Sequence, residues 1–92
     1  MTNKVNEVLA NRETRYGSFD ENAGVSVGLK DILRSGRSWD NMRPYQKEAL
    51  DMIMHKAARI VNGDPDYDDS WIDICGYSQL VVDELHKVWE KQ

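Results

Sequence analysis

The chain has 92 residues, with 16 acidic residues against 12 Lys and Arg, so its formal net charge is −4. A chain this short forms one domain, because half of it could not bury enough apolar surface to offset the entropy of ordering its backbone. The negative charge repels polyanions and argues against a general nucleic-acid binder. No apolar stretch approaches the roughly 20 residues of a membrane helix, no signal-peptide core opens the chain, and Cys75 is the lone cysteine. We therefore expect a soluble, cytoplasmic protein.

The spacing of the apolar residues predicts an all-α fold, a small helical bundle that spans residues 1–92 as a single domain. The expected helices cover residues 3–13, 20–35, 44–62 and 68–90. Gly36 and Gly63 follow the second and third helices as stop signals, and Pro44 occupies the favoured first turn of the third.

The third and fourth helices each carry an apolar stripe at helical spacing. On the third helix the stripe consists of Leu50, Ile53, Met54, Ala57, Ile60 and Val61. On the fourth it consists of Trp71, Ile74, Ser78, Val81, Val82, Leu85 and Trp89. We expect both stripes to form the core. Three tryptophans give so short a chain more apolar surface than it can easily bury by itself. We therefore also expect self-association into a homo-oligomer to complete the bundle.

Carboxylates repeat at helical spacing away from these stripes. Glu48 and Asp51 stand three residues apart, and Asp69 and Asp73 stand four apart. Carboxylate oxygens are the ligands that Mg²⁺ takes, so these four residues are the predicted metal ligands. Two interpretations stay open. Each acidic stripe is the solvated side of an ordinary helix, or the two stripes meet in a partly enclosed cleft, within one chain or between neighbouring chains.

Basic and aromatic residues beside these acids suit a nucleotide substrate. Lys56 and Arg59 would hold phosphate oxygens, while Mg²⁺ would polarise the phosphate and lower the pKa of an attacking water. His55 is a candidate catalytic base, and a plain surface histidine is the alternative. The other residues predicted to contact substrate are Arg15, Tyr16, Asp64 and Tyr77. The simpler interpretation, which we favour, is that Arg15 and Tyr16 form a connection between helices and that Asp64 forms a turn.

The run ALDMIMHKAARIVNGDPDYDDSWIDICGYSQLV, with RYGSF near the start, resembles a family of small bacteriophage and prophage proteins of unassigned function. More remotely, Lys and Arg on one helix and a following D-I-x-x-Y motif are similar to the all-α MazG-like and dimeric dUTPase-like nucleotide pyrophosphatases. That resemblance implies Mg²⁺-dependent cleavage of nucleoside triphosphates to monophosphate and pyrophosphate. By motif position, Glu48 and Asp51 match the first acidic pair of that group, and Asp69 and Asp73 match the second. Ser70 stands where the group carries an acid three residues before Asp73.

Two hypotheses for the function follow. The first is a phage-type, Mg²⁺-dependent nucleotide pyrophosphohydrolase-like or nucleotide-binding protein that acts in the cytoplasm of an infected bacterial host. The alternative is a non-catalytic, acidic helical phage protein that binds a host protein as a host-takeover or anti-defence factor. Release of pyrophosphate from nucleoside triphosphates would separate the two.

Overall fold

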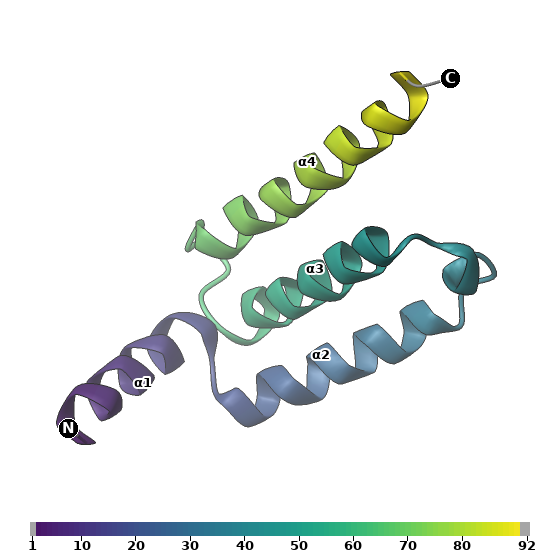
Figure 1. Cartoon of the computed structure of the whole chain (residues 1–92). Helices are drawn as coiled ribbons and strands as arrows, with labels where there is room; N and C mark the ends of the chain where they lie inside the picture. The colour runs from purple at the N-terminus through teal and green to yellow at the C-terminus, as the bar shows by residue number, and fades with distance from the viewer. Residues whose placement is uncertain (1, 91–92) are drawn as a thin grey trace.

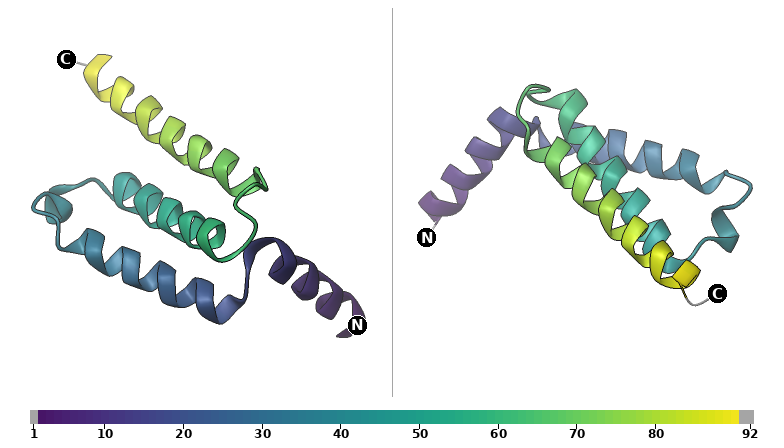
Figure 2. Two further views of the ribbon diagram at one scale, coloured as in Figure 1. Left: turned by 180° about the vertical axis from the view of Figure 1, so that it is seen from behind. Right: turned by 90° about the horizontal axis from the view of Figure 1, so that it is seen from above.

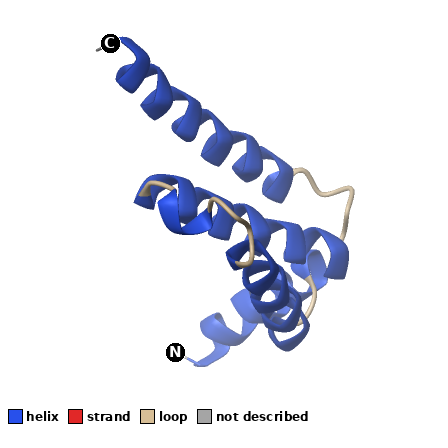
Figure 3. Cartoon of the chain, turned by 90° about the vertical axis from the view of Figure 1, so that its right-hand side faces the viewer, coloured by secondary structure: helices blue, strands red, loops and turns tan. Residues whose placement is uncertain are grey.

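The fold is all-α, as the sequence predicts (Figure 1 and Figure 3). The computed structural model describes residues 2–90, and within that range it contains four α-helices, one short 3₁₀ helix and no strand. The elements are α1 (Thr2–Tyr16), α2 (Phe19–Arg34), η1 (Trp39–Asn41), α3 (Pro44–Asn62) and α4 (Asp69–Glu90). No helix in this range combines the length and the apolar character that crossing a membrane requires.

The helix ends follow from local chemistry. α1 continues to Tyr16, three residues beyond the predicted end, and stops where Gly17 takes a positive φ of 85°. Ser18 caps α2, because its Oγ accepts a hydrogen bond from the Glu21 backbone N–H at 3.2 Å. At the start of α3, Gln46 reaches back and its Oε1 accepts from the Arg43 backbone N–H at 2.8 Å.

Helices α2, α3 and α4 lie side by side in one layer, with α3 in the middle (Figure 1 and Figure 2). Successive helices of the layer run in opposite directions. α1 leaves the layer near the start of α2 and projects away from it, so the chain is elongated, with extents of 54 × 28 × 26 Å.

The most buried side chains of the layer are small. Ala49 and Ala58 of α3, Ser26 of α2 and Ser70 of α4 are buried, and Ile60 is the only larger apolar residue in this class among residues 3–90. Short side chains at the contacts let the helix backbones approach closely. No large side chain in this range is fully buried, so the core of the single chain is thin.

The layer has two broad faces of different chemistry. Helical periodicity and the contacts between helices assign residues to each face. The polar face carries Lys30 and Arg34 of α2, Glu48, Asp51, His55 and Arg59 of α3, and Asp69 and Asp73 of α4. The apolar face carries Leu50, Ile53, Ala57 and Val61 of α3, and Trp71, Ile74, Ser78, Val82, Leu85 and Trp89 of α4. Grooves between α3 and α4 mark the two sides. One contains Leu50, Ile53 and Ser78. The other contains Glu48 and Glu84 beside apolar and aromatic side chains, among them Tyr45, Tyr77 and Leu80.

The predicted core stripes are covered only in part. Ile60 is buried as predicted, and the half-buried members are Leu50, Ile53, Met54, Ala57, Ile74, Val81 and Leu85. Val61, Trp71, Val82 and Trp89 are 69, 51, 41 and 59% exposed, so their prediction as core residues was wrong for the single chain. The reason is geometric. α3 uses two opposite sides to contact α2 and α4, and its apolar stripe points between these contacts. The side of α4 that contacts α3 instead carries Asp73, Tyr77 and Val81, which are half-buried.

Candidate functional site

Polar residues of α3 pack against α2 instead of pointing freely into solvent. Arg34 Nη2 donates to Asp51 Oδ2 at 3.1 Å, and Asn62 Nδ2 donates to Asn22 Oδ1 at 3.1 Å. The second carboxylate oxygen of Asp51 is buried and has no hydrogen-bond partner within the described part of the chain. At these positions the polar stripe of α3 is part of a helix contact.

An ion pair joins α3 to α4 on the same face. Lys56 Nζ lies 2.9 Å from Asp73 Oδ2, and the Lys56 side chain is only 12% exposed whereas that of Asp73 is 38% exposed. A predicted phosphate-binding residue and a predicted metal ligand are thus each other's partner. Because Lys56 is nearly buried, its charge depends on this carboxylate for compensation.

Tyr16 at the end of α1 connects to α3 and α4. Its hydroxyl donates to Asp69 Oδ2 at 2.9 Å, and the Arg59 guanidinium carbon lies 4.7 Å from the centroid of its ring. Burial and the hydrogen bond to Asp69 raise the pKa of the Tyr16 phenol above its usual 10.0, against the opposing effect of Arg59. The phenol stays protonated and can serve as a donor.

The loop that precedes α4 folds back onto the end of α1. The Arg15 guanidinium carbon lies 4.4 Å from the centroid of the Tyr67 ring, and the Tyr67 ring lies 5.9 Å from the Tyr16 ring. The Asp64 backbone N–H donates to the Arg15 carbonyl at 2.9 Å. Of the residues predicted to contact substrate, Arg15, Tyr16 and Asp64 therefore lie together at one junction.

Two glycines make this junction possible. A Cβ atom on Gly17 would lie 2.3 Å from the Asn62 carbonyl oxygen, and one on Gly63 would lie 2.4 Å from the Arg15 carbonyl oxygen. Both distances are far below van der Waals contact, so the segments 15–17 and 62–64 meet backbone to backbone. This contact fixes where α1 ends relative to α3.

Positive charge gathers around His55. Burial lowers the pKa of His55 below 6.5, and the positive charges of Arg59, Lys30, Lys56 and Arg12 lower it further. These cations come from α1, α2 and α3. Among residues 3–90, only Lys56 of the four has a carboxylate oxygen within 4.0 Å. A protein with a net negative charge thus gathers four cations around His55, one of them paired with Asp73, and the lowered pKa keeps His55 mainly neutral near pH 7.

A groove of about 290 Å³ opens beside these cations where α1, α2 and α3 meet. Arg12 and Arg59 provide positive charge and Glu13 one negative charge, so the charged lining is net positive. Phe19 provides an aromatic ring that is 88% exposed, and Asn22 and Tyr16 provide polar atoms. The Asn22 side-chain amide already donates to the Tyr16 carbonyl at 2.7 Å, so it helps to shape the groove.

The four predicted metal ligands are not gathered in one place. No group of three His, Cys, Asp or Glu side chains among the described residues is arranged to hold a metal ion. Glu48 is exposed and lines a separate groove of about 280 Å³ together with Tyr77, and the other three acids contact Arg34, Lys56 and Tyr16. In a single chain these acids alone do not fit one Mg²⁺, so a bound Mg²⁺ would need further oxygen ligands.

Sequence reasoning missed several residues that build the site. These residues are Arg12, Asn22, Lys30 and Arg34. Lys30 and Arg34 stand four residues apart and therefore on one side of the second helix, and Arg34 is roughly 160° around the helix from the apolar Ile32. This pattern could have identified a basic side that faces the acids of the next helix.

No protein-family model, curated protein or solved structure was found to match this chain.

Proposed function

We propose that this protein binds a phosphate-bearing small molecule, a nucleotide in the first instance, on its polar face. The observation that carries the proposal is the group of four cations around His55 in a chain whose net charge is −4. Lys56 is paired with Asp73, and Arg12, Lys30 and Arg59 have no carboxylate oxygen within 4.0 Å among residues 3–90. Cations placed this way raise the local concentration of anions, and guanidinium groups match phosphate oxygens in geometry.

The lining of the groove beside the cations suits a nucleotide better than a bare anion. Arg12 and Arg59 would contact the phosphates, while the exposed ring of Phe19 offers a flat apolar surface for a base. Tyr16 is less available for stacking, because Arg59 already lies over its ring and Asp69 accepts from its hydroxyl. In this arrangement the predicted phosphate ligand Arg59 acts with Arg12, while Lys56 is engaged by Asp73.

Hydrolysis to a monophosphate and pyrophosphate is the enzymatic form of this proposal. Mg²⁺ would supply charge neutralisation of the phosphates, and phosphate oxygens of the nucleotide would complete a coordination sphere that Asp69 or Asp73 could join. The neutral state of His55 near pH 7 leaves it able to accept a proton. The phage origin and the setting of an infected bacterial cell belong to the same proposal.

Calorimetric titration tests the proposal. Nucleoside mono-, di- and triphosphates and inorganic phosphate are titrated into the full chain, with and without Mg²⁺, and release of pyrophosphate is assayed in parallel. We expect binding of at least one nucleotide, weakened about tenfold or more in Arg59→Gln, since this change removes a charged hydrogen-bond donor to the phosphates. Arg12→Gln, at an exposed position, is a second variant that leaves the contact with Tyr16 intact.

Arg37→Gln is the matched control, because Arg37 is exposed in the connection between α2 and α3 and its loss changes the net charge equally. If no phosphate compound binds, or if Arg37→Gln weakens binding as much as Arg59→Gln and Arg12→Gln do, the proposal fails. Binding without release of pyrophosphate would retain the binding function and remove the enzymatic form.

A further inference from the structure

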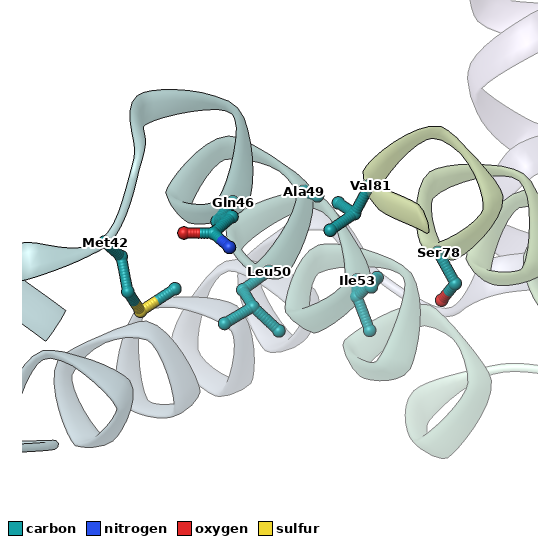
Figure 4. Close-up of a pocket in the computed structure, with 7 residues that line it drawn as sticks. All are labelled: Met42, Gln46, Ala49, Leu50, Ile53, Ser78 and Val81. Atoms are coloured by element: carbon teal, nitrogen blue, oxygen red, sulfur yellow. The ribbon is translucent and has the colours of Figure 1, made fainter. Parts of the chain in front are cut away.

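The apolar face is continuous over α3 and α4 and carries no formal charge. Its residues recur every three or four positions from Leu50 to Val61 and from Trp71 to Trp89, and none of its positions holds Asp, Glu, Lys or Arg. Between the two helices lies an apolar groove of about 460 Å³, floored by Ala49 and lined by Leu50, Ile53 and Val81 (Figure 4). Such a face is costly in water, because single soluble domains rarely expose apolar patches beyond a few hundred Å².

The chain exposes more surface than a compact folded monomer of its mass. The accessible surface is 6817 Å², about 1,300 Å² more than expected for a folded monomer of this mass. The radius of gyration is 15.9 Å, against roughly 12 Å for a compact domain of this length. The projecting helix α1 supplies part of the excess area, and the uncovered apolar face supplies another part. The part that the apolar face supplies is smaller than this total, and a standard protein interface needs only about 800 Å² per partner.

We infer that a second copy of this chain covers the apolar face, so that two three-helix layers pack face to face around a shared core. The inference is independent of the proposed nucleotide site, which lies on the opposite face and stays open in such a dimer. The dimer uses the same surface on both copies, as a two-fold axis requires. Because this face is uncharged, two copies can approach through it without the repulsion that their net negative charge causes elsewhere.

Two lysine substitutions on α4 test the inference. Val82 lies on the apolar face and is 41% exposed, whereas Leu80 lies on the other side of the helix and is 61% exposed. The two positions are roughly 160° apart around the helix. Sedimentation equilibrium of the native chain should give twice its mass of 10.6 kDa. Val82→Lys should raise the dimer dissociation constant about tenfold or more, which is about 1.4 kcal/mol, and Leu80→Lys should leave it within about twofold.

A second measurement does not depend on how the variants fold. The melting temperature of the native chain should rise with protein concentration, because dilution favours the dissociated state of a dimer. A monomeric mass with a concentration-independent melting temperature would overturn the inference. An equal effect of both lysine substitutions would overturn it as well, and a stable complex of one copy with a different protein through this face would assign the face to that partner.

Discussion

The two faces of the layer differ in how many of their side chains find partners within the single chain. On the polar face, Asp51, Asp69 and Asp73 each have a partner from another helix, in Arg34, Tyr16 and Lys56 respectively. On the apolar face, large side chains such as Val61 and Trp89 remain more than half exposed. The difference teaches that small buried residues and polar contacts hold the helices of one chain together, while several of its largest apolar side chains stay exposed and available for association. Changes on one face should therefore leave the measurable property of the other face intact.

The largest effect on stability should come from Gly17→Ala. The new Cβ would approach the Asn62 carbonyl oxygen at 2.3 Å while φ is 85°, so both a clash and backbone strain oppose the substitution. We expect a loss of about 3 kcal/mol or more in the free energy of unfolding, measured by urea denaturation. Gly24→Ala is the control, because nothing lies within 4 Å of its new Cβ and a helical Ala should stabilise by about 0.5 to 1 kcal/mol. Equal effects of the two substitutions would contradict the backbone contact between segments 15–17 and 62–64.

The next effect should come from Asp73→Ala. This substitution leaves the nearly buried Lys56 ammonium without its carboxylate, although the partial exposure of Asp73 reduces the penalty. We expect a loss of about 1 to 3 kcal/mol, with no change in the mass measured by sedimentation at protein concentrations well above the dimer dissociation constant. Changing Lys56→Met in the same chain should recover most of the loss, since it removes the uncompensated charge. A double variant as unstable as the single one would show that the ion pair is not the cause.

A smaller effect should come from Tyr16→Phe. The substitution removes the hydroxyl that donates to Asp69 and keeps the ring under Arg59, so we expect a loss of about 1 kcal/mol. Tyr67→Phe keeps the ring contact with Arg15 and removes a hydroxyl for which the structure gives no hydrogen bond among the described residues. Thermal denaturation of both variants should therefore show a shift for Tyr16→Phe and almost none for Tyr67→Phe.

The smallest effect should be a dependence of stability on pH that originates at His55. Its pKa in the folded chain lies below 6.5, so the unfolded chain binds more protons as the pH falls through this region. The contribution of neutral His55 to the free energy of unfolding is complete above pH 6.5, the usual pKa of histidine. It is lost as the pH falls through the lower pKa of the folded state. His55→Gln should flatten this part of the pH profile of the urea midpoint. A profile unchanged by the substitution would exclude His55 as its source.

The sequence predicted the fold better than the packing. The helices between Phe19 and Glu90 begin and end within about one residue of the expected bounds, because capping and stop residues such as Ser18, Pro44 and Gly63 act locally. The side of each helix that is buried could not be predicted in this way. Periodicity gives one apolar stripe per helix, but α3 lies between two neighbours and also buries part of its polar side.

Five of the residues predicted for the site, Arg15, Tyr16, Arg59, Asp64 and Asp69, lie around one junction, although Tyr16 and Asp69 are 53 residues apart in the sequence. The sequence did not predict that Lys56 pairs with Asp73 or that Glu48 lies apart from the other acids. Those outcomes depend on the rotation of α4 against α3, which results from the fit of small side chains such as Ala49 and Ser70 and leaves no periodic signal in the sequence.

The close contact of Gly17 with Asn62, and of Gly63 with Arg15, has a consequence for α1. Since main-chain atoms anchor the base of this helix, its direction does not depend on which side chains it carries farther out. Val5, Val8 and Leu9, each at least half exposed, can therefore change identity without altering the geometry of the anchor. Substitutions should therefore be tolerated along the outer part of α1 and opposed at Gly17 and Gly63, where any new Cβ would meet main-chain atoms.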